Sequence, residues 1–190
     1  MRRQLPTAIV VFVALSVLTG IVYPLVVTGI AQVAFGPKAN GSLIVRNGRT
    51  AGSSLIGQSF EGSRYFHPRP SAAGDGYDAM SSGASNLGSS NPALLGAVAQ
   101  RKDEYRRVNG LGGGERVPVD AITGSGSGLD PDISPATARL QARRVAEARG
   151  VPLVRVLRLV DQATEGRSLG ILGDPGVNVL ELNLALDERL

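Results

Sequence analysis

Few residues of this chain combine the types and the spacing that chemistry requires, and most of them lie in expected loops. His67 is the only histidine, so the chain cannot build a histidine-rich metal site. Because it stands between Phe66 and Pro68, we expect it to order a loop through hydrogen bonds rather than to act as a general base. The absence of cysteine excludes disulfides, thiolate catalysis and cysteine-based zinc sites.

Three aspartates, Asp120, Asp130 and Asp132, are close enough in the sequence to hold a hard cation. Carboxylates are the ligands that calcium and magnesium prefer, but the spacing of an EF-hand is absent. Aspartates also cap helices and close turns by accepting hydrogen bonds from the backbone. We therefore interpret these three residues as capping and turn acids.

The glycine-rich segment 124–128 could cradle a phosphate or hold a nucleophilic serine. A P-loop continues with Lys and then Ser or Thr, whereas here Leu129 and Asp130 follow, and an aspartate repels phosphate. A nucleophile elbow leads directly into a helix, which this segment does not do. The start of a helix at Pro135 could hold an anion, but every helix shares that property. The sequence therefore predicts no catalytic site.

The sequence predicts both helices and strands around these residues, and together they indicate an α+β fold. Segment 58–90 is a long loop rich in Gly, Ser, Pro and Asn, and it contains the motif Tyr65–Ser71. Asn91-Pro92 and Ser134-Pro135 are typical helix starts, and Gly150 is a typical helix end. The predicted helices are 92–108, 135–149 and 152–163. The predicted strands are 42–45 and 54–57 around a tight turn at Asn47-Gly48, then 117–123, and finally 179–186, where leucines alternate with other residues.

An apolar run near the N-terminus is the strongest signal in the chain. No residue between Arg3 and Lys38 is charged, and residues 8–33 are almost wholly apolar. About 20 helical residues cross the ~30 Å hydrocarbon layer, so the run can span a membrane once. A cleaved signal peptide has a shorter apolar core of about 7–15 residues, so we expect a retained anchor. The predicted parts are a cytoplasmic N-terminus (1–7), a transmembrane helix (8–33) and one soluble extracytoplasmic α+β domain (36–190).

The predicted span carries small or helix-bending residues at four-residue intervals, namely Ser16, Gly20, Pro24 and Thr28. Residues four apart lie on one side of a helix, and small residues allow helices in lipid to approach closely. We predict that this side contacts a partner helix and that the other sides, which carry Val, Leu and Ile, face lipid. Pro24 lacks a backbone N–H, so a kink is expected there.

The distribution of charge indicates an orientation and argues against nucleic acid as a partner. Arg2 and Arg3 precede the span, and short flanks count most under the positive-inside rule, whereas long domains are translocated largely regardless of charge. The N-terminus is therefore predicted to be cytoplasmic. All sixteen acidic residues and eighteen of the twenty basic residues follow the span. The soluble part is thus only mildly basic, which does not favour binding to nucleic acid.

Several blocks in a fixed order make the chain resemble the C subunit of the bacterial high-affinity potassium-transporting P-type ATPase, the KdpC family. Together they cover essentially the whole chain. The blocks are Tyr-Pro at 23–24, Ala-Asn-Gly-Ser-Leu at 39–43, Leu-Ile-Gly-Gln-Ser-Phe at 55–60, Tyr-Phe-His-Pro-Arg-Pro-Ser-Ala at 65–72, Ser-Asn-Leu-Gly at 85–88, Ser-Gly-Leu-Asp-Pro at 127–131 with Ile-Ser-Pro at 133–135, and Val-Asn-Val-Leu-Glu-Leu-Asn-Leu-Ala-Leu at 177–186.

The resemblance implies a non-catalytic accessory subunit in the cell (inner) membrane. Its implied partners are a channel-like potassium-binding subunit and an ATP-hydrolysing P-type subunit. In this family the C subunit is described as a catalytic chaperone that raises the affinity of the pump for ATP, so ATP is the implied cofactor. Gln141 is our match for the glutamine proposed to contact nucleotide. The loop motifs add Tyr65, His67, Arg69 and Asn86 as candidate site residues.

An extracytoplasmic domain cannot touch cytoplasmic ATP. Either the topology is reversed or the effect on ATP travels through the membrane span, and we favour the second explanation. The outer domain would then lie over the entrance of the ion path and stabilise the assembled complex. The alternative is a free-standing membrane-anchored binding module with a ligand pocket near His67 and Arg69. An anchored hydrolase would need an activated serine, for which the sequence gives no signal.

Overall fold

The computed structural model describes residues 4–190 and divides the chain into two compact units. The first unit extends to Ala51, and the second, which we call the body, extends from Gly52 to Leu190. We describe each unit by itself.

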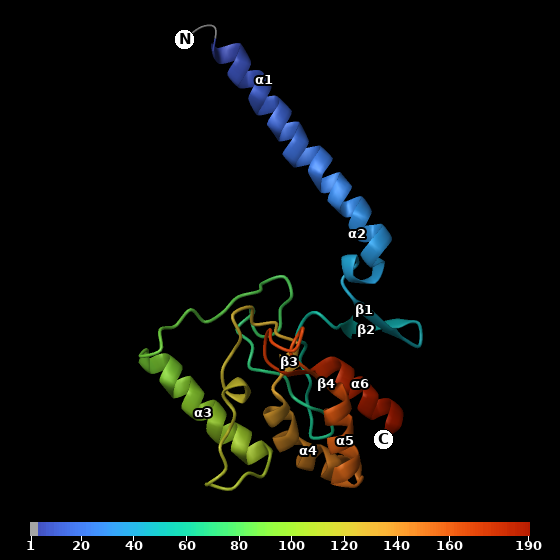
Figure 1. Ribbon diagram of the computed structural model, residues 1–190. Helices are drawn as coiled ribbons and strands as arrows, with labels where there is room; N and C mark the ends of the chain where they lie inside the picture. The colour runs from blue at the N-terminus through green and yellow to red at the C-terminus, as the bar shows by residue number, and fades with distance from the viewer. Residues whose placement is uncertain (1–3) are drawn as a thin grey trace. The chain divides into compact units, whose positions relative to one another are not determined.

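The first unit is dominated by one long apolar helix, drawn in blue in Figure 1. It consists of α1 (Gln4–Val17), a π-helical turn η1 (Leu18–Val22) and α2 (Tyr23–Ala39). The helix is 36 residues long, and its 18-residue apolar stretch is not buried in the protein. By length and composition it could cross a membrane. It contains the predicted span 8–33 and continues beyond both of its ends.

A π turn directly precedes Pro24, where a kink was expected, whereas the backbone departs from helical geometry further on, at Phe35 (φ −136°, ψ +34°). Proline cannot donate to the carbonyl four residues earlier, and its ring crowds that carbonyl. In the π turn the backbone N–H of Tyr23 donates to Leu18 O, five residues earlier, and the hydroxyl of Thr19 donates to Leu15 O at 2.8 Å. The wider turn thus ends directly before the proline.

A two-stranded hairpin follows the helix. It pairs β1 (Leu43–Arg46) with β2 (Arg49–Ser53). Asn47 and Gly48 have φ values of +50° and +73°, which confirms the predicted tight turn. The predicted returning strand 54–57 is wrong, because the turn is only two residues long and pairing therefore begins at Arg49.

The body combines four helices with one small antiparallel sheet (Figure 1). The helices are α3 (Pro92–Val108), α4 (Pro135–Arg149), α5 (Leu153–Ala163) and α6 (Val179–Arg189). The strands are β3 (Asp132–Ile133), β4 (Thr164–Glu165) and β5 (Gly176–Asn178), in the order β3-β5-β4. Ile133 and Thr164 both pair with Val177 of the central strand. The α+β class is confirmed.

Local cap chemistry explains where the predicted helices begin and end. Asn91 accepts a hydrogen bond from Ala93 N at the start of α3, and Ser134 accepts one from Thr137 N at the start of α4. Gly150 ends α4 in the left-handed conformation, with φ +68°. All three helices of the predicted set are confirmed.

The predicted strand 179–186 is wrong, because this segment is helix α6. Its buried residues recur at helical intervals, and its Leu, Ala and Glu residues favour a helix. Asn178 caps the helix by accepting a hydrogen bond from Glu181 N at 3.1 Å. The leucine alternation was compatible with both periods over so short a run. The buried residues of α6 are Val179, Leu180, Leu182, Asn183 and Leu186.

The predicted strand 117–123 is also wrong. The segment forms a short 3-10 turn, η2 (Val119–Ala121), closed by Ala121 N donating to Pro118 O. Asp120 explains the turn, because its carboxylate accepts hydrogen bonds from Ser134 and so points the backbone toward the start of α4.

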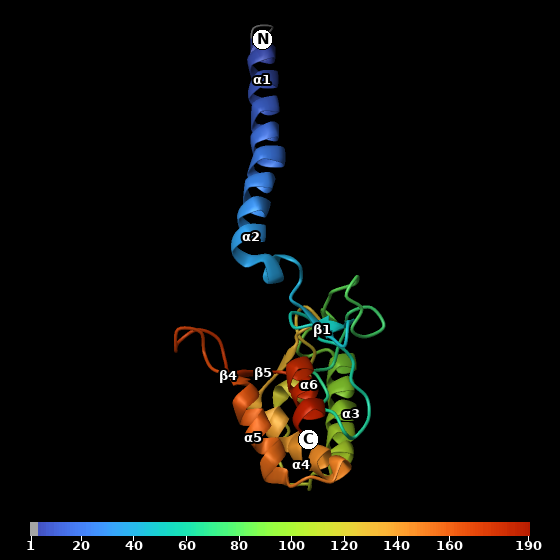
Figure 2. The same ribbon diagram turned by 90° about the vertical axis from the view of Figure 1, so that its right-hand side faces the viewer.

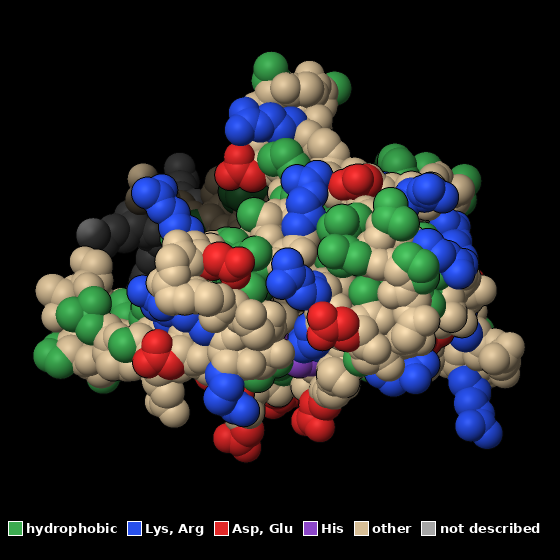
Figure 3. Space-filling view, turned by 90° about the horizontal axis from the view of Figure 1, so that it is seen from below, with side chains coloured by type: hydrophobic (Ala, Val, Ile, Leu, Met, Phe, Trp, Pro, Cys, Tyr) green, Lys and Arg blue, Asp and Glu red, His purple; other side chains and the backbone are tan. Residues whose placement is uncertain are grey.

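The core of the body lies between α4, α5, α6 and the sheet, which cluster together in Figures 1 and 2. In contrast α3 buries no residue completely. Charged side chains of both signs are interspersed on the face shown in Figure 3. One aromatic residue from the long loop, Phe66, is fully buried in this core. It packs with Ile133, Ala138, Ala142, Val145, Ala146, Val156, Leu159, Val160, Val177, Val179, Leu182 and Leu186.

Candidate functional site

The motif Tyr65–Ser71 is held in the core by two side-chain amides. Asn183 of α6 accepts from Phe66 N at 2.8 Å and donates to Phe66 O at 2.9 Å. Gln141 of α4 accepts from His67 N at 2.8 Å and donates to His67 O at 3.0 Å. We call these two pairs the amide clamps. Both side chains are buried, with 1% of their surface exposed.

The amide clamps replace the neighbours that a strand would have in a sheet. In an extended chain the N–H and C=O of successive residues point to opposite sides. Phe66 therefore offers its backbone groups to α6, and His67 offers its own to α4. Because buried backbone groups are costly when unpaired, each amide satisfies two groups at once. An irregular loop segment is thereby fixed between two helices.

Arg144 extends this network beneath the loop. It is nearly buried, and it donates to the carbonyls of Gly62 and Ser63 at 3.2 and 2.8 Å. It also donates to Asn109 Oδ1 at 3.0 Å and to Gln141 Oε1 at 2.8 Å. Burial lowers the pKa of its guanidinium, and nearby Tyr105 opposes this effect. Four acceptors thus compensate for placing a charge in the interior.

His67 orders the loop, as expected. Its Nε2 lies 2.9 Å from Gly62 O. Burial lowers the pKa of the imidazole, and the charge of Arg144 lowers it further. Its backbone is held by Gln141. The hydrogen-bonding role of His67 in the loop is therefore confirmed.

Tyr65 joins the other end of the motif to α6. Its hydroxyl lies 3.3 Å from Asp187 Oδ2, and the guanidinium of Arg149 lies 5.2 Å from the centre of its ring. Arg149 also pairs with Asp187 at 2.7 Å and donates to Arg64 O at 2.8 Å. The predicted motif residue Tyr65 is therefore part of a closed set of internal contacts.

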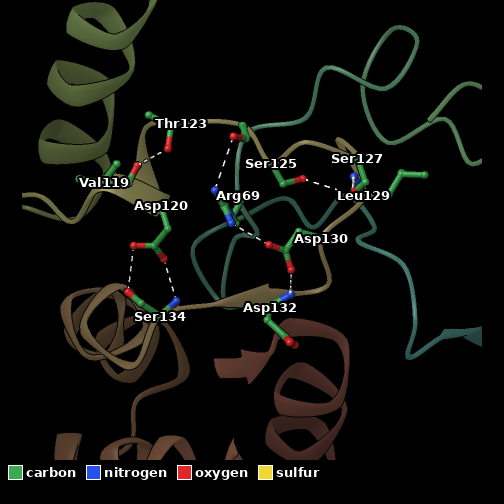
Figure 4. Close-up of polar contacts among 11 residues, drawn as sticks. Arg69, Val119, Asp120, Thr123, Ser125, Ser127, Leu129, Asp130, Asp132 and Ser134 are labelled. Atoms are coloured by element: carbon green, nitrogen blue, oxygen red, sulfur yellow. Dashed lines mark hydrogen bonds and ion pairs between the residues drawn. The ribbon is translucent and has the colours of Figure 1, made fainter. Parts of the chain in front are cut away.

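Arg69 links the motif to the segment before α4, as Figure 4 shows. Its Nη1 lies 2.7 Å from Asp130 Oδ2, and its Nη2 lies 3.5 Å from Gly124 O. Asp130 in turn accepts from Asp132 N at 3.0 Å. Asp120 accepts from the backbone N of Ser134 at 2.7 Å and from its hydroxyl at 2.9 Å.

The interpretation of Asp120 and Asp130 as capping and turn acids is therefore confirmed by their contacts. All three aspartates line one cavity of about 460 Å³, and Arg69 and Asp174 line it as well. Burial raises the pKa of Asp132, and the charge of Asp130 adds to the effect. No group of three or more metal-ligating side chains suited to an ion occurs within residues 4–190.

The glycine-rich segment 124–128 packs against the loop motif. Gly128 has φ +69°, and a Cβ built there would lie 2.5 Å from Gly83 O and 2.7 Å from Ala73 N. Glycine is therefore required by both conformation and space. The hydroxyl of Ser71 donates to Gly128 O at 2.6 Å. These contacts indicate that segment 124–128 is rich in glycine because it packs closely against neighbouring loops.

A second cavity, of about 500 Å³, lies between α3 and the rest of the body. Its lining includes His67, Pro70, Arg101, Glu104 and Tyr105. Tyr105 donates to Thr137 O at 3.1 Å, and burial raises the pKa of its hydroxyl. This cavity adjoins the motif at His67, where the alternative of a binding module placed its ligand. Gln141 is not among the residues that line it.

The remaining predicted site residues lie apart from the clamped motif. Asn86 lines a cavity of about 330 Å³ and has φ +53°, a conformation that asparagine tolerates. Ser16, Gly20, Pro24 and Thr28 are exposed on the long helix.

The π turn η1 affects how the four small residues are arranged. In a regular α-helix, the twelve steps from Ser16 to Thr28 would turn the direction of the Thr28 side chain about 120° away from that of Ser16, viewed along the helix axis. A π turn takes one additional residue, which reduces this rotation to about 20°. The row therefore stays closer to one side of the helix. Its contact with a partner remains a prediction.

The sequence did not indicate that Asn183, Arg144 and Asn109 belong to the hydrogen-bond network around the motif. A polar Asn183 within the apolar run 179–186 was the available signal, because a buried amide must have partners. Arg144 gave no such signal, since arginines on helices are usually exposed. Its carbonyl partners are more than 80 residues away in the sequence.

Comparison with known proteins identifies the family. Residues 5–188 match the family described as KdpC: K+-transporting ATPase, c chain. The potassium-transporting ATPase KdpC subunit of Rhodospirillum rubrum is 58% identical over 190 residues, which covers 100% of this chain and 97% of the relative. The subunits of the same name from Mycobacterium tuberculosis and Gemmatimonas aurantiaca are 57% and 55% identical, covering 98% of this chain and 99% and 94% of those relatives.

These matches extend over nearly the full length of both chains. The chain belongs to the KdpC family of potassium-transporting ATPase subunits. The sequence-based resemblance is confirmed, and so is the assignment to a potassium-transporting complex. Other subunits of such a complex are its partners.

Proposed function

We propose that this chain is a non-catalytic accessory subunit of an ATP-driven high-affinity potassium uptake complex. It would stabilise the assembly and act as a catalytic chaperone that raises the ATP affinity of the ATP-hydrolysing subunit. The proposal is carried by one observation. The polar side chains at the centre of the body, Gln141, Asn183 and Arg144, form hydrogen bonds with its own backbone, and Arg144 also donates to Gln141.

Such a network favours a rigid body over an active site. A catalytic base or nucleophile must have a lone pair or proton free for substrate. Here Nε2 of His67 binds Gly62 O, and the two terminal nitrogens of Arg69 bind Asp130 and Gly124, while Nε of Arg69 is buried without a hydrogen-bond partner. Rigid structure is what a subunit needs in order to hold partners in one arrangement.

Gln141 remains our predicted nucleotide contact, but its amide group already takes part in hydrogen bonds within the body. Its amide oxygen accepts from His67 N and Arg144, and its amide nitrogen donates to His67 O. Direct contact with ATP would require this clamp to open. We therefore favour coupling through the long helix, with the N-terminus cytoplasmic and the body outside.

The topology test uses the absence of native cysteine. Met80 is 95% exposed, so Met80→Cys should react with a membrane-impermeant maleimide in intact spheroplasts. Gln4→Cys, before the span, is the matched control and should react only after permeabilisation. The reverse pattern would place the body in the cytoplasm and make direct contact between Gln141 and ATP possible.

The functional test compares the purified complex with and without this chain. We expect loss of the chain to raise the KM for ATP more than it lowers kcat, because an affinity effect acts on binding. Gly20→Leu should weaken co-purification, since a large side chain separates closely packed helices. An unchanged KM for ATP in the stripped complex would contradict the chaperone role.

A further inference from the structure

The loop between β4 and β5 ends in a tight hairpin that projects from the body, as Figure 2 shows. Ser168 and Leu172 exchange two backbone hydrogen bonds, each 2.9 Å long. Leu169, Gly170 and Ile171 lie between them, and Ile171 N donates to Ser168 O at 3.3 Å, so Leu169 and Gly170 are the central residues of a four-residue turn. We call residues 168–172 the hairpin tip.

The turn places a leucine in a conformation that leucine avoids. Leu169 has φ +55°, and Gly170 has φ +78°. Positive φ at both central residues is the pattern of a type I′ turn, whose first position favours Asn, Asp or Gly. A branched aliphatic side chain is disfavoured there because its Cβ approaches the backbone. Within residues 4–190, Leu169 is the one aliphatic side chain with positive φ.

The same leucine is also unfavourably exposed. Leu169 is 89% exposed, and its neighbours Ile171 and Leu172 are 76% and 57% exposed. Backbone strain and apolar exposure both oppose folding of the isolated chain. Leu169, Ile171 and Leu172 are not among the side chains that form the core of the body or pack against it. The compensation is therefore expected from a contact outside the chain.

The base of the hairpin is firmly attached. Thr164 and Glu165 of β4 pair with Val177 and Gly176 of β5, and Val177 is fully buried. Closer to the tip, Arg167 and Asp174 form an ion pair at 3.0 Å across the two arms. The two arms are thus paired at their base by β4 and β5 and at their end by Ser168 and Leu172, with the exposed ion pair between, and a preorganised element loses less entropy on binding.

We propose that the hairpin tip inserts into a preformed apolar pocket on another subunit of the potassium-transporting ATPase, with Leu169 as the central side chain. This inference rests on the proposed role as an accessory subunit. A strained but rigid turn suits a fixed pocket, because a shaped pocket can require one defined side-chain position. A fluid bilayer adapts to any conformation and gives no reason for the strain.

The composition of the hairpin also favours a protein pocket over lipid. Segment 164–175 contains no aromatic residue, and it carries the acids Glu165 and Asp174 beside a single Arg167. Segments that bind the membrane interface typically use aromatic residues and an excess of basic ones. The partner pocket is therefore expected to be apolar at its base and polar at its rim, opposite Arg167 and Asp174.

The first test measures assembly after Leu169→Asn. Asparagine tolerates the left-handed conformation, so the hairpin should fold while its apolar side chain is lost. With all subunits co-expressed, we expect recovery of the partner subunits on the tagged variant to fall about tenfold, as for the loss of a central interface residue. Met80→Asn removes an equally exposed apolar side chain elsewhere and should leave recovery unchanged.

This comparison separates two failures. If the wild-type chain does not recover other ATPase subunits, the proposed function fails. If the wild-type chain recovers them and Leu169→Asn does so equally well, only the role of the hairpin tip is overturned. Equal losses in Leu169→Asn and Met80→Asn would also overturn it, because the effect would then not be specific to the tip.

The second test identifies what surrounds the tip. The chain has no cysteine, so Ile171→Cys, which keeps Leu169 in place, can be labelled at one position with a polarity-sensitive fluorophore before it is assembled with its partners. We expect a blue shift in the assembled complex and none in the chain alone in nanodiscs. A blue shift in nanodiscs alone would show lipid insertion, and a concentration-dependent shift in detergent would show self-association. Either result, or no shift in the complex, would overturn the proposal.

Discussion

Two irregular segments of the body differ in how their backbone groups are hydrogen-bonded and in where their apolar side chains lie. In the clamped motif around Phe66 and His67, the backbone is satisfied by side chains of other elements, and the apolar side chain of Phe66 is fully buried. In the hairpin tip, the backbone is satisfied by hydrogen bonds within the hairpin itself, and the apolar side chains of Leu169 and Ile171 face outward.

The difference shows which parts of the molecule are complete without partners. The clamped motif has acceptors, donors and apolar neighbours within the chain, so changes there should affect folding. The hairpin tip has unfavourable exposure and strain, so changes there should affect assembly strongly and folding only slightly. The long helix resembles the tip in this respect, since α1, η1 and α2 contain no buried residue.

The largest expected effect on folding is that of Asn183→Leu. Leucine has a similar size, but it leaves the N–H and C=O of Phe66 unpaired in the core. Since each unsatisfied buried group costs about 1–3 kcal/mol, unfolding free energy should fall by about 2–5 kcal/mol. Chemical denaturation of the full chain in detergent measures it. Gln162→Leu, on the exposed side of α5, is the control and should change little, because it loses only one exposed hydrogen bond, from Arg189. An equal effect of both substitutions would contradict the clamp.

Gln141→Leu should have an effect of similar size, about 2–5 kcal/mol, because the backbone of His67 is less buried than that of Phe66 but the buried Arg144 also loses an acceptor. The two clamps hold adjacent residues, so their effects should not add. Once one clamp is lost, the segment can move toward water and the second clamp matters less. A double-mutant cycle measures this coupling. Strict additivity would show that each clamp acts independently.

Local chemistry explains which elements could be predicted from the sequence. The starts of α3 and α4 follow from Asn91, Ser134 and the prolines after them, because a cap is decided by neighbouring residues. The segment 179–186 was mispredicted because alternating leucines fit two periods over eight residues. The helix is favoured there by the Asn178 cap and by the long-range bonds of Asn183 to Phe66.

The candidate site was predicted only in part for a related reason. The sequence pointed to Tyr65, His67, Arg69 and Gln141, yet it could not show that Gln141 binds the backbone of His67, 74 residues away. Such contacts depend on how loop and helices pack, which no local pattern encodes. The hairpin tip was missed because a leucine normally gives no signal for a left-handed turn.

A pH dependence of stability tests the clamped motif at His67. Burial, reinforced by Arg144, lowers its pKa below the ordinary value of 6.5. The unfolded chain therefore binds a proton more readily than the folded chain, so unfolding free energy is level above about pH 6.5 and falls as the pH drops toward the folded-state pKa. Denaturation at several pH values should show this slope. His67→Gln retains an amide donor for Gly62 O and should lose it. The same slope in the variant would assign it to other groups.

The smallest expected effect is that of Leu169→Asn on folding, and its sign is informative. Asparagine tolerates φ +55° better than leucine does, and an 89% exposed leucine loses little packing, so stability of the chain without partners should rise by up to about 1 kcal/mol. Ile171→Asn is the matched control, because Ile171 is 76% exposed but lacks a positive φ, and it should bring no gain. Denaturation midpoints of the two variants and the wild type provide the comparison. A loss of stability in Leu169→Asn would mean that the leucine already packs within the body, and the contrast between the two segments would then fail.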